Sequence, residues 1–293
     1  MSLPEGEHEI EASRAPLLDH LTELRSRLIA CAQALVLGFI VCFIFSKEIY
    51  LFLLQPFVRA ADLMAVQKAG HAGSFDLFLA VIGLKPVAHG AAGSLHLVFT
   101  EPLEFFFTKV KLAGFGAIVL AFPVLAFQLY GFVAPGLYKR ERRAFLPFLT
   151  AAPFLFLLGA ALVYFIMLPF VLWFSLNQQI VGAGSIDVQL LPKVSDYLTL
   201  VTGLLLAFGL CFQLPVVLSL LGMAGLVTTA MLTAVRRYAV VGVFIIAAIL
   251  TPPDPFSMMS LALPGLLLYE VSILCVWLIE RRRKREDAAA EAA

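Results

Sequence analysis

Long uncharged apolar segments constrain this sequence more than any other feature. The segment from Tyr197 to Val235 contains no charged residue, and similar runs recur along the chain. Hydrophobic residues make up 61% of the sequence and charged residues 14%, whereas soluble domains contain roughly half apolar and about a quarter charged residues. Because such a chain cannot cover its surface with polar groups, we expect an all-α protein that spans a membrane several times.

The apolar runs predict six membrane-spanning helices, since one crossing needs about 20 mostly apolar residues. The run that starts at Tyr197 is too long for one straight helix, so we divide it near Gly222–Gly225. The expected helices cover residues 28–45, 112–133, 144–176, 197–221, 238–250 and 255–279.

The fifth expected helix is short. Its residues, Tyr238–Leu250, would extend only about 20 Å, less than the roughly 30 Å hydrocarbon core of a bilayer. The run Thr251-Pro252-Pro253-Asp254-Pro255 then ends the helix and reverses the chain. We therefore expect short fifth and sixth helices that form a hairpin.

The distribution of Lys and Arg predicts the orientation in the membrane. If the N-terminus is cytoplasmic, fourteen of the 21 Lys and Arg residues lie in cytoplasmic segments and seven in outer segments. Most of those seven lie in a long first outer loop, about residues 46–111. We predict cytoplasmic termini and a single polytopic domain, with an amphipathic N-terminal segment 1–27, a core 28–279 and a charged tail 280–293.

Composition and motifs exclude several classes of protein. A net charge of +1 leaves no large basic field for nucleic acid. The four cysteines lie inside apolar runs without CxxC spacing, the five histidines have no metal-like spacing, and the sequence has no nucleotide-binding glycine loop. The predicted spans contain no nucleophile–base pair. We therefore expect no metal, no cofactor and no enzymatic activity.

Two charged segments outside the spans are candidates for function. Leucines at helical spacing from Leu17 to Leu28 predict an amphipathic helix, on whose polar side Glu23 and Arg27 form an i,i+4 pair. The segment Ala134–Arg143 places four cations around Glu141. This segment is either a positively charged cytoplasmic loop or an anionic recognition point for a cationic peptide.

Two polar residues inside predicted spans are further candidates. Glu270 is either a functional carboxylate, because ionised placement in a membrane costs about 3 kcal/mol, or a structural residue near the cytoplasmic side. Gln213 precedes Pro215, which should bend the helix. The Gln213 amide either satisfies the carbonyl that Pro215 frees at residue 211 or hydrogen-bonds a partner helix.

Four of these segments, in this order, resemble the TatC family, the polytopic subunit of the twin-arginine protein translocase. They are His20–Leu28, Ala134–Arg143, Phe208–Pro215 and Leu250–Asp254, and the resemblance runs from about residue 16 to residue 280. It implies a receptor and scaffold that binds twin-arginine signal peptides of folded precursors at the cytoplasmic face of the bacterial inner membrane. It also implies an oligomeric complex with single-span TatA- and TatB-like proteins, driven by the protonmotive force.

The resemblance also implies site residues. The family's signal-binding positions fall on Glu23, Arg25, Phe132, Pro135 and Glu141. Together with the polar residues above, the partner-binding or structural candidates are Pro56, Gln213, Pro215, Thr251, Pro253, Asp254 and Glu270. Two separated carboxylates suit adjacent arginines, because a guanidinium offers a carboxylate two parallel hydrogen bonds.

The sequence departs from the family pattern in three places. Gln213 stands where many relatives carry a glutamate, and Met258 stands at a position that is often polar. The first outer loop is unusually long and contains the short apolar segment Phe75–Leu84, which we expect to lie at the interface or pack on the protein.

The alternative function is a secondary transporter or channel for a small solute. Such a protein should show internal repeats and broken helices around a polar site at the bilayer midplane. The sequence shows no convincing repeat between its halves and few polar residues at midplane depth. The translocase interpretation therefore has more support.

Overall fold

The structure is a computed structural model that describes residues 5–68, 98–99, 101–133, 142–178, 180–183, 186–188, 193–250 and 255–291. Nearly all of these residues are helical, apart from one short antiparallel strand pair. The elements are α1 (Glu5–Ile44), α2 (Ser46–Lys68), α4 (Glu104–Val133), α5 (Arg142–Leu162), a π-helical segment (Val163–Met167), α6 (Leu168–Asn177), β1 (Ile180–Ala183), β2 (Ile186–Val188), α7 (Val194–Cys211), α8 (Leu214–Met223), α9 (Thr229–Leu250) and α10 (Pro255–Glu291).

In the described part of the chain, six helical segments are long and apolar enough to cross a membrane, the number that the sequence predicts. They are Thr22–Ile44, Glu104–Gly131, Thr150–Asn177, Val194–Met223, Thr229–Ile249 and Leu261–Arg285. The predicted division between the fourth and fifth spans is confirmed, since α8 ends at Met223 and α9 begins at Thr229. Gly225 lies in this connection with a φ of 71°, a backbone conformation that glycine adopts without steric cost.

The third and fourth spans are each interrupted. α5 passes through the π-helical segment into α6, whose first turn contains Pro169. α7 and α8 are separated by Phe212 and Gln213, and Pro215 lies in the first turn of α8. Proline lacks an N–H and its ring clashes with the carbonyl four residues earlier, so a helix cannot continue unchanged through it. The helix is thus interrupted immediately before Pro215, where the sequence predicts a bend.

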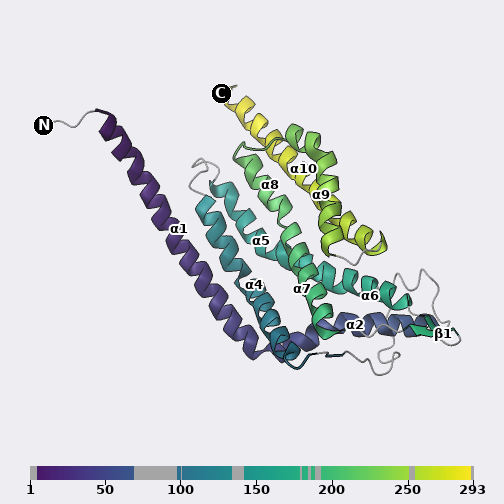
Figure 1. Ribbon diagram of the computed structural model, residues 1–293. Helices are drawn as coiled ribbons and strands as arrows, with labels where there is room; N and C mark the ends of the chain where they lie inside the picture. The colour runs from purple at the N-terminus through teal and green to yellow at the C-terminus, as the bar shows by residue number, and fades with distance from the viewer. Residues whose placement is uncertain are drawn as a thin grey trace.

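The amphipathic N-terminal segment and the first span form one continuous helix, α1, of 40 residues. At 1.5 Å per residue, α1 is about 60 Å long. Figure 1 shows it at one edge of the molecule, with its second half beside α4. Small residues permit this close packing: a Cβ on Gly38 would lie 3.2 Å from the Ala117 backbone, and a Cβ on Gly116 would overlap Cys42.

α2 is a helix that sequence analysis did not predict, because its charged residues made the segment look like part of an outer loop. It contains Pro56, which cannot donate to the carbonyl of Phe52. The Tyr164 hydroxyl donates to that carbonyl at 2.7 Å, and the Tyr197 hydroxyl donates to the Leu53 carbonyl at 2.7 Å. Two phenols from the third and fourth spans therefore hold α2 at its proline, and Figure 1 shows α2 beside α6.

The last two helices are longer than predicted, so the expectation of short helices is corrected. α9 has 22 residues and includes Arg236 and Arg237, and α10 has 37 residues. Sequence analysis began the fifth span after the two arginines, but long basic side chains can reach the interface from inside a helix. The Thr229 N–H and hydroxyl donate to the Glu280 carboxylate at 2.9 and 2.8 Å, which ties the start of α9 to α10.

The core lies where the third and fourth spans cross. A Cβ on Gly159 of α5 would lie 2.7 Å from the Phe212 ring, and a Cβ on Gly209 of α7 would lie 2.5 Å from the Phe156 ring. The Phe212 ring therefore packs against Gly159, and the Phe156 ring packs against Gly209, in the space that a Cβ would occupy. The Phe156 ring also stacks on Phe122 of α4 at a centroid distance of 3.9 Å. This crossing fixes α4, α5 and α7 relative to one another.

Candidate functional site

Glu23 lies on α1, where Arg27 holds its carboxylate from one turn further along the helix. Arg27 Nη2 and Nε donate to Glu23 Oε1 at 2.7 and 3.0 Å. The Glu23 side chain is 37% exposed and the Arg27 side chain 26% exposed. Both donors use the same oxygen, and within the described part of the chain no group donates a hydrogen bond to Oε2.

Arg27 also joins α1 to α4. Its Nη1 donates to Gln128 Oε1 at 3.2 Å and lies 3.5 Å from the Gln128 main-chain oxygen. Gly131 lies one turn further along α4, and a Cβ at this position would clash with Arg27 Nη1. Glu23 is thus connected through Arg27 to the end of α4. The segment that carries Glu141 begins just beyond this end, since α4 ends at Val133.

Of the other predicted signal-binding residues, Arg25 is the one whose side chain the structure describes. Arg25 is exposed on α1, and two positions along a helix correspond to about 200°, so it points away from Glu23. Phe132 belongs to the last turn of α4, but its side chain lies outside the described residues. Pro135 and Glu141 lie wholly outside them.

Gln213 lies inside the protein between two spans. Its side chain is 8% exposed, and its Nε2 donates to the Ala152 carbonyl of α5 at 2.9 Å. The amide therefore faces the interior rather than lipid, and its acceptor is not the carbonyl of residue 211 that sequence analysis named. Its Oε1 is buried, with no hydrogen-bond partner among the described residues. Pro215 is also buried, in α8.

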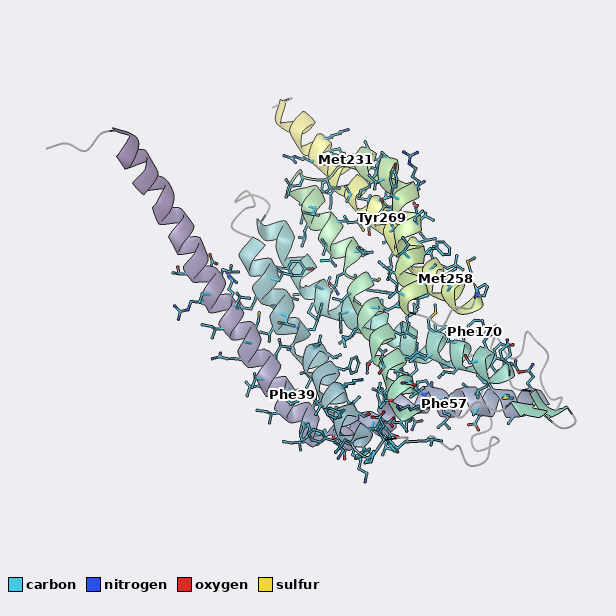
Figure 2. All side chains as sticks on the ribbon, in the orientation of Figure 1. Phe39, Phe57, Phe170, Met231, Met258 and Tyr269 are labelled. Carbon is cyan, nitrogen blue, oxygen red and sulfur yellow. The ribbon has the colours of Figure 1, made fainter. Side chains whose placement is uncertain are left out.

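The remaining partner-binding or structural candidates lie in separate places. Glu270 of α10 is not isolated, because Arg236 Nη2 of α9 lies 2.7 Å from its Oε2, and both side chains are about half exposed. Tyr269 beside it donates from its hydroxyl to the Leu232 carbonyl at 2.8 Å, and Figure 2 shows Tyr269 where α9 and α10 pack together. Pro56 is buried in α2. Thr251, Pro253 and Asp254 lie outside the described residues.

The sequence did not point to Gln128 or Gly131 as site residues, and its spacing predicted a Glu23–Arg27 pair that is local to one helix. The available signal was weak: Gln128 is a single polar residue in the otherwise apolar run 112–133. Among the residues whose side chains the structure describes, no group of three or more potential metal ligands occurs. The geometry is that of a partly exposed acidic acceptor at the end of a helical bundle.

Comparisons with known proteins agree with this architecture. The family described as Sec-independent protein translocase protein (TatC) matches residues 19–264. A protein of Magnetococcus marinus with the name Sec-independent protein translocase protein TatC is 40% identical over 279 residues, which cover 95% of this chain and 90% of that protein. A protein of Aquifex aeolicus with the same name is 35% identical, covering 94% of this chain and all of that protein.

The fold is similar to a solved structure as well. A crystal structure of a twin-arginine translocase receptor, TatC, superimposes with a TM-score of 0.68 at 32% identity, and covers 89% of this chain and 99% of that chain. The family match, the relatives and the six spans agree. This multi-pass membrane protein therefore belongs to the TatC family of Sec-independent protein translocase proteins.

Proposed function

We propose that this protein is the signal-peptide receptor of a twin-arginine translocase in a bacterial inner membrane. It binds the twin-arginine signal of a folded precursor at its cytoplasmic face, and it acts as a non-enzymatic scaffold for a translocation site that the protonmotive force drives. The observation that carries this proposal is the partly exposed Glu23 carboxylate, whose Oε2 accepts no hydrogen bond from a described residue. A ligand guanidinium can donate to this oxygen.

The proposal assigns two carboxylates to two arginines. Glu23 holds one guanidinium, and Glu141, which follows α4 in the sequence, holds the other. Charge-assisted hydrogen bonds to a carboxylate are roughly twice as strong as neutral ones. The planar guanidinium also orients them, whereas lysine offers a point charge without this geometry. The cations beside Glu141 repel basic peptides in general, which favours a ligand that satisfies both carboxylates.

The proposal includes partners. TatA- and TatB-like single-span proteins and further copies of this chain assemble around the receptor within the bilayer. Two spans support this idea, because the first and fifth have only 11% of their apolar windows buried within the chain, against 56% for the fourth. Thr251, Pro253 and Asp254 at the outer turn and Pro56 in α2 are the proposed contact or supporting positions.

The test measures capture of a twin-arginine signal peptide by the full chain in lipid vesicles. Glu23→Ala and Glu141→Ala should each weaken capture by about 1.5–3 kcal/mol, the effect of losing a hydrogen bond to a charged group. Glu141→Gln should retain part of the affinity, because the amide oxygen still accepts, and Glu141→Lys should bind more weakly than Glu141→Ala.

Glu48→Ala is the matched control, since Glu48 is an exposed glutamate on α2. It should bind like the parent protein, and a peptide with two lysines in place of the arginines should bind weakly. If all the Glu23 and Glu141 variants capture the signal peptide like the parent protein, the proposed function of these carboxylates is wrong.

A further inference from the structure

Arg27 makes contacts that exceed those of an ordinary surface ion pair. Exposed i,i+4 pairs on a helix contribute only about 0.3–0.5 kcal/mol, because both side chains lose conformational freedom to form them. In this protein the Arg27 guanidinium has a second partner on another helix, Gln128 of α4, at 3.2 Å. Its rotamer is therefore fixed from two sides.

The sequence of α4 makes room for this contact. Gly131 lies where a Cβ would clash with Arg27 Nη1. Tyr130 and Ala126 of the same helix are buried, whereas Leu129 is 63% exposed. Gln128 is of intermediate exposure and turns its amide oxygen toward α1. α4 thus offers one acceptor and one gap at the place where the guanidinium lies.

The two Arg27 donors that reach Glu23 converge on a single oxygen. Nη2 and Nε lie 2.7 and 3.0 Å from Oε1, while Nη1 donates to Gln128. All three donating nitrogens of the guanidinium are in use, so the carboxylate is held in one orientation relative to α4. Oε2, the second oxygen, receives no hydrogen bond from the described residues.

We infer that Arg27 is a positioning residue, which Gln128 and Gly131 hold in place so that Glu23 presents Oε2 to a ligand guanidinium. The inference rests on the proposed function and deepens it. Arg27 has two opposite effects on ligand affinity. It strengthens binding by orienting the Glu23 carboxylate, and it weakens binding because its positive charge repels the cationic ligand. A variant that keeps both charges and removes only the Gln128 contact separates these two effects.

Gln128→Leu is that variant. It removes the Gln128 side-chain acceptor of Arg27 Nη1 and leaves Glu23 and Arg27 unchanged. The full chain in lipid vesicles should capture a twin-arginine signal peptide about three- to tenfold more weakly, the fold-change that corresponds to one lost hydrogen bond. Gln128→Glu should bind like the parent protein, because a carboxylate also accepts from Nη1. Leu129→Ala, on the exposed side of the same turn, is the control and should have no effect.

A double-mutant cycle distinguishes positioning from a general structural role. If Arg27 and Gln128 act through Glu23, Gln128→Leu should not weaken capture further in a Glu23→Ala protein. Equal protein abundance and equal thermal unfolding of Gln128→Leu and the parent protein exclude loss of folded receptor.

The outcomes separate the two proposals. If Glu23→Ala binds like the parent protein, the proposed function of Glu23 fails, and the inference about Arg27 fails with it. If Glu23→Ala weakens capture but Gln128→Leu does not, only the inference about Arg27 is overturned. That inference is also overturned if Glu23→Ala and Gln128→Leu each weaken capture and the double variant loses affinity by the product of the two single losses. Such a result would mean that Gln128 does not act through Glu23.

Discussion

Two polar side chains inside the spans, those of Gln213 and Glu270, have partners on neighbouring helices. Gln213 donates to the Ala152 carbonyl across the α5–α7 crossing, and Glu270 pairs with Arg236 between α9 and α10. An intramembrane carboxylate with a basic partner is less costly than an isolated one, because the pair compensates part of the desolvation. Both residues therefore contribute to helix packing in the described structure.

The buried amide of Gln213 leads to a prediction about stability. Gln213→Leu should lower the free energy of unfolding by about 0.6–1.7 kcal/mol, the range measured for hydrogen bonds between membrane helices. Recruitment of TatA- or TatB-like partners, measured by crosslinking per folded molecule, should stay unchanged. Gln213→Glu should be tolerated, since a protonated carboxyl can also donate to Ala152.

Gln33→Leu is the control, because Gln33 is an exposed amide on α1, and it should not change the unfolding transition. Reduced partner crosslinking by a Gln213→Leu protein of normal stability would show instead that this amide contacts a partner.

At the scale of elements, glycines decide how closely the spans approach. A Cβ on Gly159 of α5 would lie 2.8 Å from the Phe208 carbonyl and 2.7 Å from the Phe212 ring. Backbone cannot move aside as a side chain can, so this crossing has a fixed separation. By contrast, a Cβ on Gly203 of α7 would meet no atom within 4 Å.

These two glycines form a matched pair for a test of packing. Gly159→Ala should lower the free energy of unfolding by about 1–3 kcal/mol, the usual cost of overpacking a core. Gly203→Ala should cause no loss and should gain up to about 1 kcal/mol from the higher helix propensity of alanine. Thermal unfolding of the two purified variants in detergent measures the difference. Melting of Gly159→Ala at the parent temperature would contradict the described crossing.

At the scale of the whole molecule, the spans place the chain ends on one side. Figure 1 shows the beginning of α1 and the end of α10 directed toward the same end of the bundle, with α2 and β1 at the opposite end. The α8–α9 connection lies at the end where α10 terminates, since the Glu280 carboxylate accepts from Thr229. With the excess of Lys and Arg on this side, we expect it to face the cytoplasm.

Cysteine labelling tests this orientation in intact cells, in a variant that lacks the four native cysteines. Cysteines introduced at Arg142 and Glu286 should be protected from a membrane-impermeant thiol reagent, because we place both in the cytoplasm. A cysteine at Gly73, which the sequence places in the predicted first outer loop, should react. Detergent permeabilisation should expose the first two positions and serves as their control. Labelling of position 142 in intact cells would reverse the proposed orientation.

The sequence by itself determined the six spans, their division near Gly225 and the break before Pro215. Apolar runs of about 20 residues and prolines act locally, so these features could be predicted without knowledge of the packing. The resemblance to the TatC family, read from four motifs, located Glu23 as a candidate. The length of α9 was misjudged because arginines inside a helix near the interface resemble a loop in the sequence.

Only the tertiary structure decided which side chains meet. Arg27 and Gln128 are 101 positions apart in the sequence, and the hydroxyl of Tyr164 and the carbonyl of Phe52 are 112 positions apart. Each contact depends on the rotation of two helices and on a local gap, such as the one beside Gly131. No periodicity within one helix encodes that relative rotation, because it is fixed by the packing of all the spans together.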